Sequence, residues 1–353
     1  MPDGYQRNVA IIGAGMVART HVMALADLGH KLRLRAVYSR RPDATEAFAR
    51  DATQRCGYSV AAYSSLQAIC ADPDIHWVIV LTPPNARLPI VEALAVAGKS
   101  ILLEKPVERD LPAATQLVTT CEKANVTLGV VFQHRVRQAS RALADLISGG
   151  TTGNLAMAEV FVPWWRDQSY YDEPGRGSYA RDGGGVLISQ AIHSLDLLLS
   201  LAGPVDAVQA MAHSTHLHQM EAEDYVTAAF RFKNGAAGSL IASTASYPGD
   251  AESITLHFSH CVARLQSGEL RVIWRDGRTD ITGETAATGG GADPMAFTHE
   301  WHRDVIEDFA DSMVQDTPPL VPGRAALQVH ALIGAIVQSS NEKRAVSVPD
   351  VKV

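Results

Sequence analysis

The feature of the sequence that most constrains its fold is a glycine-rich turn near the start. Gly13, Gly15 and Ala18 follow the apolar run 8–12, which is typical of a buried parallel strand, and open a helical pattern over residues 16–28. In this strand–turn–helix context the G-x-G-x-x-A spacing indicates a dinucleotide site. The first glycine permits the turn, the second lets a pyrophosphate approach the backbone, and the alanine allows close helix–strand packing. The predicted contacts are Gly13, Ala14, Gly15, Met16 and Val17.

The chain shows two different patterns of secondary structure. Up to residue 133, apolar strands alternate with helical patterns, which predicts βαβ units on a parallel sheet. Beyond it, period-two patterns such as 227–232 and hairpin signals at 233–235 and 275–277 predict an α+β domain with a large, mostly antiparallel open sheet. We therefore expect an α/β protein with a Rossmann domain at 1–133 and a second domain at 134–353. Its last helix, over 324–338, could pack back on the first domain.

Composition argues against several other classes of protein. Lys and Arg total 31 against 38 Asp and Glu, a net charge of −7, so the basic excess typical of nucleic-acid binding is missing. The apolar stretches are far shorter than the roughly 18 residues of a membrane span, and the start, MPDGYQRNVA, lacks the apolar segment of a signal peptide. Four scattered cysteines indicate free thiols in a reducing compartment. We expect a cytoplasmic protein without nucleic-acid or membrane partners.

The end of the second predicted strand bears on the choice of cofactor. An NAD site usually places a carboxylate there for the ribose hydroxyls, but this chain has Ser39, Arg40 and Arg41. A hydroxyl and two guanidinium groups suit a 2′-phosphate, which favours NADP over NAD. A solvated helix start, or adenine stacking on an arginine, would also account for them.

Two further segments lie at the carboxyl edge of the predicted sheet, where open α/β sheets bind ligands. Thr82, Pro83 and Asn85 follow one strand, and Glu104 and Lys105 follow the next. We expect the first group to line the nicotinamide ribose. A lysine ammonium aimed into a cleft can hold a substrate hydroxyl or stabilise an alkoxide, although a surface lysine paired with Glu104 is an equal alternative on the residues alone.

In the second domain a Gly-Gly-Gly run at 183–185 leads into a helix that carries Ser189, His193 and Asp196. Their spacings of four and three predict one shared helical face. A histidine near a hydroxyl and a carboxylate can act as a general acid or base, while a satisfied buried histidine is the plainer interpretation.

These motifs together resemble the Gfo/Idh/MocA family, the relatives of glucose-fructose oxidoreductase and inositol dehydrogenase. The resemblance covers nearly the whole chain and is carried most specifically by E-K-P at 104–106 and by G-G-G…H-x-x-D at 183–196. It implies a nicotinamide oxidoreductase that acts on a sugar, an inositol or a related polyol. It also implies a homodimer or homotetramer formed through the open sheet of the second domain.

The resemblance further implies roles for single residues. Lys105 matches the family's catalytic lysine and His193 its catalytic histidine, whereas Ser189 stands where relatives usually carry Asp. Arg87 stands where many relatives carry histidine, and we assign it no catalytic role. Ser189 and the adjacent Gln190 are expected to contact substrate.

Aromatic residues and histidines elsewhere are less specific. The segment 163–171, which includes Trp165 and Arg166, weakly resembles family members that act on amino-sugar nucleotides, and it could form a substrate wall, a core patch or an interface. The histidines at 213, 216 and 218 have mixed spacing, and those at 299 and 302 are three apart instead of the four of a zinc helix. We expect no metal site.

Two other functions remain open. One is a glycosidase that keeps NAD bound and oxidises its substrate transiently. The other is a sensor that retains the dinucleotide site without catalysis, although a sensor would have no need of both Lys105 and His193.

Overall fold

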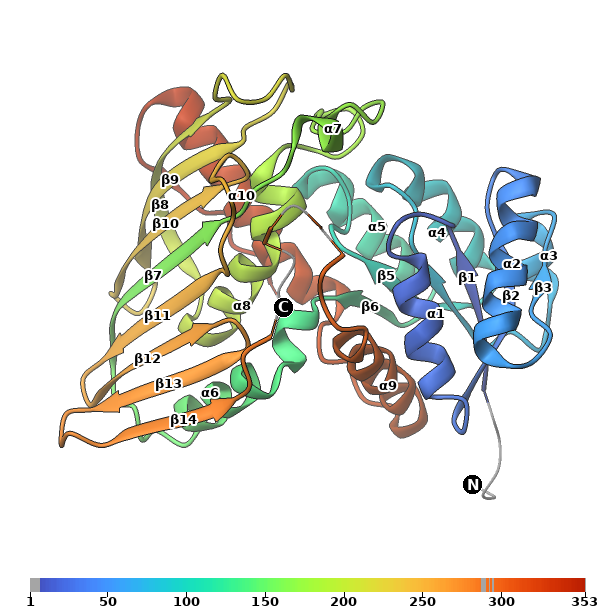
Figure 1. Ribbon diagram of the computed structural model, residues 1–353, viewed down its shortest axis with the longest axis horizontal. Coiled ribbons are helices and arrows are strands. Elements are labelled where there is room, and N and C mark those ends of the chain that lie inside the picture. The colour runs from blue at the N-terminus through green and yellow to red at the C-terminus, as the bar shows by residue number, and fades with distance from the viewer. Residues whose placement is uncertain (1–6, 287–289, 292, 294, 353) are drawn as a thin grey trace. The chain divides into compact units, whose positions relative to one another are not determined.

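The computed structural model describes residues 7–286, 290, 291, 293 and 295–352 (Figure 1). The chain divides into two compact units. The first comprises residues up to Glu108, Pro112–Gln133 and His299–Ala326, and the second comprises Arg109–Leu111, His134–Thr298 and the residues from Leu327 on. No helix in the described ranges is long and apolar enough to cross a membrane.

The first unit is built on a six-stranded parallel sheet in the order β3-β2-β1-β4-β5-β6. This is the strand order of a Rossmann fold, with its topological switch between β1 and β4. The strands are β1 (Arg7–Ile12), β2 (Leu32–Tyr38), β3 (Ala61–Ala62), β4 (Trp77–Val80), β5 (Ser100–Glu104) and β6 (Leu128–Val131). The strands β4, β5 and β6 are buried along their whole length, as expected for a sheet covered on both faces.

Helices connect the strands in the right order for βαβ units. They are α1 (Ala18–Asp27), α2 (Pro42–Cys56), α3 (Leu66–Ala71), the 3-10 turn η1 (Pro84–Ala86), α4 (Arg87–Val96) and α5 (Leu111–Lys123). The later helix α9 (Glu300–Gln315) also belongs to this unit but connects none of these strands. Pro42 begins α2, where its missing N–H costs nothing, and Gly57 ends it in a left-handed conformation. The predicted α/β class with a parallel first sheet is confirmed.

The segment that carries α9 differs from the expected division at residue 134. His299–Ala326 belongs to the first unit, because α9 packs against α1 and inserts Phe309 beside Trp77, with ring centroids 5.0 Å apart. Phe309 is fully buried, and Gly129 lies so close to it that a Cβ there would be 2.6 Å from the ring. Removing such a side chain costs about 3–5 kcal/mol, so apolar packing keeps this late segment in the first unit.

The second unit contains a nine-stranded sheet in the order β14-β13-β12-β11-β7-β10-β9-β8-β15. All its pairings are antiparallel except that of β7 with β10. The predicted large, mostly antiparallel sheet is therefore confirmed. The strands are β7 (Leu155–Pro163), β8 (Val205–His213), β9 (Tyr225–Phe232), β10 (Ala237–Ser243), β11 (Ser253–Phe258), β12 (Cys261–Gln266), β13 (Glu269–Trp274), β14 (Thr279–Gly283) and β15 (Val346–Ser347).

Helices cover one face of this sheet, as Figure 1 shows for α6 and α8. The helical elements in the second part of the chain are η2 (Gln133–Val136), α6 (Gln138–Ser148), α7 (Gln168–Tyr171), η3 (Leu187–Ala191), α8 (Ile192–Ala202) and α10 (Gly323–Glu342). Only the first four residues of α10 belong to the first unit. Its later part lies on the second unit, where Ser339 and Ser340 accept hydrogen bonds from the β8 backbone at Ala210 and Ala212.

Candidate active site

The glycine turn lies at the switch point of the parallel sheet. Gly13 has φ +110°, and a Cβ on it would lie 3.0 Å from the backbone carbon of Leu81, at the end of the neighbouring strand β4. The position of a Cβ on Gly15, in contrast, has no atom within 4 Å. Gly13 is thus required by the fold, whereas Gly15 leaves open space before α1.

The other predicted residues of this turn surround that space. Ala14 and Met16 are exposed, and Val17 is half-buried at the N-cap of α1, where no side chain caps the helix. Backbone N–H groups at an uncapped helix start are suited to an anion. The turn therefore fits the pyrophosphate of a dinucleotide, which could occupy the open space at Gly15.

The segment after β2 presents cationic side chains. Arg40 and Arg41 are exposed, and neither forms an ion pair within the described part of the chain. The Ser39 hydroxyl lies 2.9 Å from the Thr45 hydroxyl and donates to the Arg41 carbonyl oxygen. Ser39 therefore shapes the turn, while the two guanidinium groups remain available to a ligand.

The loop after β4 has a polar atom without a partner. The Thr82 hydroxyl oxygen is buried and has no hydrogen bond, Pro83 is half-buried, and Asn85 is exposed. An unsatisfied buried hydroxyl costs free energy unless a ligand or water supplies a partner. Together with the open space at Gly15, this atom supports binding of a dinucleotide at the carboxyl edge of the sheet.

A buried cluster of two histidines and a carboxylate lies beside Lys105. The Nε2 atom of His21, on α1, is 2.9 Å from Oε1 of Glu104, and Nε2 of His302, on α9, is 3.5 Å from the same oxygen. The other oxygen of Glu104 accepts a hydrogen bond of 3.1 Å from the backbone N–H of Lys105. The Lys105–Pro106 peptide is cis. The carboxylate of Glu104 thus faces the interior and fixes the backbone at Lys105.

The electrostatics of this cluster favour an ionised glutamate. Burial opposes ionisation of Glu104, but hydrogen bonds from His21 and His302 outweigh it and hold the pKa of Glu104 well below its usual range. Burial lowers the pKa of His302 below its ordinary value. The three side chains also have the composition of a metal site, with ligand atoms within 4.8 Å of one another. The 2.9 Å separation between His21 and Glu104 is that of a hydrogen bond.

In the second unit the three-glycine run is required by close packing. A Cβ on Gly185 would lie 1.8 Å from the carbonyl oxygen of Glu223, and one on Gly183 would lie 2.4 Å from that of Arg109. Oε1 of Glu223 accepts hydrogen bonds from the backbone N–H groups of Gly185 and Leu187. Burial raises the pKa of Glu223. These contacts fix the start of the helix that carries Ser189 and His193.

That helix begins with a π-helical turn. Ser189 and Gln190 lie in η3, and His193 lies in α8. The prediction that Ser189 shares a face with His193 assumed α-helical spacing throughout, whereas residues 187–191 form the wider π-turn. Such turns occur frequently at functional sites. Gln190 is buried, and its Oε1 has no hydrogen-bond partner.

The neighbours of His193 were not found from the sequence. Its ring stacks on that of His134, with centroids 4.9 Å apart and an interplanar angle of 23°. Asp196, which the spacing predicted on the same helical face as His193, is buried and accepts two hydrogen bonds of 2.7 Å from Arg135. Burial raises the pKa of Asp196 despite the charge of Arg135. His134 is therefore the ring partner of His193, and Asp196 belongs to a separate ion pair.

The expected substrate wall combines a half-buried aromatic ring with a buried arginine. Trp165 packs edge-on against Tyr247, with ring centroids 5.4 Å apart. Arg166 donates from Nη1 to the carbonyl oxygens of Trp165 and Gly291 at 2.7 and 2.6 Å. Burial lowers the pKa of Arg166. Arg166 thus contributes to the shape of this wall, and the indole of Trp165 is its more accessible part.

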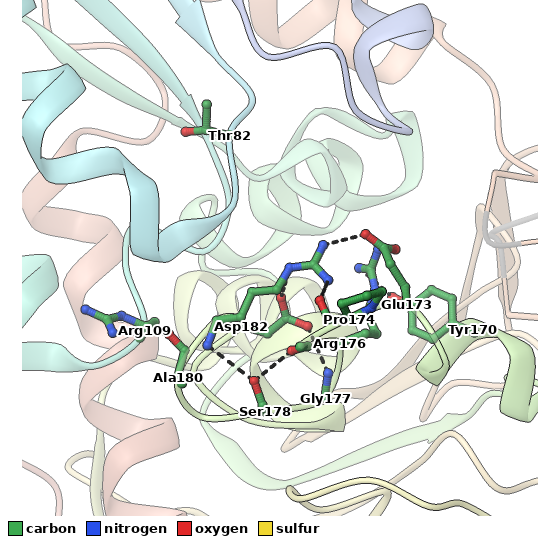
Figure 2. Close-up of polar contacts among 12 residues, drawn as sticks. Thr82, Arg109, Tyr170, Glu173, Pro174, Arg176, Gly177, Ser178, Ala180 and Asp182 are labelled. Atoms are coloured by element: carbon green, nitrogen blue, oxygen red, sulfur yellow. Dashed lines mark hydrogen bonds and ion pairs between the residues drawn. The ribbon is translucent and has the colours of Figure 1, made fainter. Parts of the chain in front are cut away.

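An ionic network holds the loop that leads to the glycine run (Figure 2). Arg176 pairs with Glu173 and lies 4.7 Å from the ring centroid of Tyr170. The carboxylate of Asp182 accepts a hydrogen bond of 3.0 Å from the Gly177 backbone. The Tyr170 hydroxyl lies 3.3 Å from Nη1 of Arg176 and 3.4 Å from Nε2 of Gln190. Tyr170 therefore connects this loop to the turn that contains Ser189.

The other histidines that were considered as metal ligands have structural partners or are exposed. His218 bonds to Asp224 and to the carbonyl oxygen of Arg166, both at 2.8 Å. His299 lies 2.8 Å from Asp27, and His213 and His216 are exposed.

Comparisons with known proteins match most of the chain to one family of oxidoreductases. Residues 7–132 match the model of an oxidoreductase family with an NAD-binding Rossmann fold, and residues 140–264 match that of the GFO/IDH/MocA C-terminal domain. Levoglucosan dehydrogenase of Pseudarthrobacter phenanthrenivorans is 25% identical over 98% of each chain. Myo-inositol 2-dehydrogenase of Thermotoga maritima is 25% identical over 97% of this chain and 99% of the relative. The crystal structure of the WlbA dehydrogenase from Bordetella pertussis in complex with NADH and UDP-GlcNAcA superposes with a TM-score of 0.81, at 28% identity over 98% of this chain and 100% of that one.

Proposed function

Because this chain belongs to the Gfo/Idh/MocA family of oxidoreductases, we propose that it transfers a hydride between a nicotinamide cofactor and a hydroxyl or carbonyl carbon of a sugar, inositol or sugar derivative. The observation that carries the proposal is the anchored backbone of Lys105, where the buried carboxylate of Glu104 accepts its N–H. The named activities of the relatives, levoglucosan dehydrogenase and myo-inositol 2-dehydrogenase, support a sugar or polyol as the substrate.

The cofactor would be held by the turn Gly13–Val17 and by the loop that contains Thr82, Pro83 and Asn85. When bound, it supplies the acceptor or donor of the hydride. We favour NADP, because the exposed Arg40 and Arg41 suit a phosphate and the segment offers no carboxylate to a ribose hydroxyl. NAD remains the alternative. Glu104 would act through the backbone of Lys105, since its carboxylate is engaged inside the unit.

Two side chains carry the proposed proton chemistry. In oxidation His193 takes the proton of the substrate hydroxyl, and the ammonium of Lys105 donates a hydrogen bond to the same oxygen as negative charge develops on it. In reduction His193 returns the proton. Ser189 and the unsatisfied Oε1 of Gln190 would bind substrate hydroxyls. The ring of Trp165 would stack on a sugar face, bordered by Arg166.

We also propose that the second unit forms homodimers or homotetramers through the open face of its sheet. Phe161, Ile241 and Met211 lie in one row across β7, β10, β9 and β8, because Phe161 pairs with Ile241, Ile241 with Thr227, and Thr227 with Met211. The three large apolar side chains are 45, 40 and 57% exposed. Adjacent exposed apolar residues of this size mark interaction surfaces. Sedimentation of the wild type and of Ile241→Glu tests this assignment. If both proteins sediment with the mass of a single chain, the assignment is wrong.

The activity is tested by following nicotinamide absorbance with NADP+ or NAD+ and a panel of inositols, aldoses and sugar nucleotides. We expect reduced cofactor to accumulate with at least one sugar or polyol. Lys105→Met and His193→Asn should retain cofactor binding and lose about 10²–10³-fold in kcat. Release of sugar without net reduction would identify the glycosidase alternative, and binding without turnover across the panel would favour the sensor.

A further inference from the structure

Arg87 is a buried cation at the edge of the sheet where Lys105 lies. It begins α4, directly after the loop that follows β4, and is only 2% exposed. Burial lowers its pKa to about 10, with opposition from Glu104 and Glu108, so the guanidinium remains charged at neutral pH. Burying a charge is costly unless hydrogen bonds satisfy it. The partners of Arg87 therefore indicate what the charge stabilises.

Those partners are backbone carbonyl oxygens in two neighbouring loops. Nε donates to the carbonyl of Thr82 at 2.9 Å. Nη1 donates to the carbonyls of Glu104 and Pro106, which flank Lys105 on either side. Nη2 lies 3.5 Å from the carbonyl oxygen of Lys105 itself. One planar guanidinium thus joins the loop after β4 to the loop after β5.

The same short segment is held from a second direction. The carboxylate of Glu104 accepts the Lys105 N–H, and Oε1 of that carboxylate is bound by His21 from α1. Arg87 therefore binds carbonyl groups on both sides of Lys105, while the carboxylate of Glu104 accepts the backbone N–H of Lys105. The backbone of this lysine is constrained at consecutive peptide groups by side chains from α1, α4 and β5.

We propose that Arg87 is a positioning residue that fixes the backbone of Lys105 and, through Thr82, the wall beside the nicotinamide. This inference rests on the role proposed for Lys105. Arg87 acts through the carbonyl groups it binds and not by contact with substrate or cofactor. Its planar fork of five N–H donors can serve several acceptors at once, which the single ammonium of a lysine cannot reproduce in the same geometry.

The chain contains a matched control for this inference. Lys99 is also a buried cation of the first unit, 8% exposed, and its ammonium donates to the carbonyl oxygens of Asp72 and Ile75 at 2.7 and 2.8 Å. It precedes β5, and its acceptors precede β4, so it joins loops at the amino ends of the strands that Arg87 joins at their carboxyl ends. Loss of either cation leaves carbonyl oxygens without their side-chain donor, but of the two cations only Arg87 contacts the segment around Lys105.

The experiment compares Arg87→Met, Arg87→Lys and Lys99→Met in the full-length protein. Melting temperature, kcat and KM are measured across pH. The rate at which an amine-reactive reagent modifies the side chain of Lys105 is measured by mass spectrometry. We expect both methionine variants to lower the melting temperature. Arg87→Met should lower kcat about tenfold to a hundredfold, as misplacement of a reacting group does, and should change the labelling rate of Lys105. Lys99→Met should keep kcat within about twofold of the wild type and leave the labelling rate unchanged.

The outcomes separate this inference from the proposed function. Equal kcat, pH profile and Lys105 labelling in Arg87→Met and Lys99→Met would overturn the positioning role. Near-normal turnover of Lys105→Met would instead overturn the proposed function on which it rests. If Arg87→Met does not fold, Arg87→Lys keeps the charge and still decides the question. A kcat and labelling rate equal to those of the wild type in Arg87→Lys would overturn the positioning role, because a single ammonium cannot bind the carbonyl groups on both sides of Lys105 in the same geometry.

Discussion

The imidazole rings of His134 and His193 are stacked, with centroids 4.9 Å apart and planes inclined by 23°. His134 is itself 3.8 Å from Oε1 of Glu252, and the same oxygen accepts a hydrogen bond of 2.7 Å from Arg137. All four side chains are buried, so the ring that we propose as the general acid and base has a defined neighbour on one face. The stacked ring limits the orientations that His193 can adopt.

Substitution of His134 should therefore affect turnover through the geometry of His193. His134→Ala removes the ring and should lower kcat about tenfold or more, because a proton acceptor must be held in position. His134→Phe keeps a flat ring of similar size and should preserve most of kcat while removing a titratable group. Profiles of kcat against pH for both variants provide the measurement. Identical profiles for the alanine, phenylalanine and wild-type proteins would show that the stacking has no catalytic consequence.

His302 should make stability fall as the pH is lowered from neutral. Its pKa is lowered by burial, below the 6.5 of the exposed group, so below pH 6.5 the unfolded state binds the proton more strongly than the folded state. Stability therefore falls with decreasing pH, by at most about 1.4 kcal/mol per pH unit for one group. The low pKa of Glu104 acts in the same direction only below its ordinary value of 4.5.

The measurement is chemical denaturation between pH 7.5 and 5.5, a window in which Glu104 does not contribute. His302→Gln retains a hydrogen-bond donor toward Glu104 and should flatten the dependence. A matched substitution at the exposed His216 should leave it unchanged, because that side chain is not buried. An unchanged slope in His302→Gln would mean that another group titrates in this window.

The contrast between His302 and the glycine turn shows what local sequence can reveal. The contacts at Gly13 come from the end of β4, a strand whose apolar pattern is clear in the sequence. His302 reaches Glu104 only because α9 returns to the first unit by packing Phe309 against Trp77. No motif or spacing in the sequence connects His302 with Glu104. The sequence therefore suggested His302 only as a metal ligand.

The second unit illustrates a different limit. The hairpins and the mostly antiparallel sheet follow from turn residues and period-two patterns, which are local. The π-turn at Ser189 depends on the packing of Gly185 against Glu223, where a Cβ would lie 1.8 Å from a carbonyl oxygen. The stacking of His134 on His193 likewise joins residues that are far apart in the sequence. The candidate site residues were predicted from motifs, whereas the partners that support them depend on the assembled fold.

The two glycines of the turn should respond differently to the same change. Gly13→Ala places a side chain at φ +110° and 3.0 Å from Leu81, so we expect a loss of about 1–3 kcal/mol in the free energy of unfolding. Gly15→Ala meets nothing within 4 Å and should leave stability unchanged. Its methyl group should nevertheless raise the dissociation constant of the cofactor about tenfold or more, since it occupies space proposed for the pyrophosphate. Nicotinamide fluorescence titration and thermal unfolding test both. Unchanged affinity in Gly15→Ala would place the cofactor elsewhere.

Cofactor preference should depend on Arg40 and Arg41. If they bind a 2′-phosphate, the double substitution to alanine should lower kcat/KM for NADP about tenfold to a hundredfold and leave that for NAD nearly unchanged, because each removes a charge-assisted hydrogen bond at an exposed site. The wild-type affinity for NADP should also weaken with salt more than that for NAD. Arg50→Ala, on the helix α2 that follows these residues, removes an exposed cation that pairs with Glu46 at 3.8 Å, and it serves as the control for net charge. An equal loss for both cofactors would instead indicate that an arginine stacks on the adenine, and the preference for NADP would then be wrong.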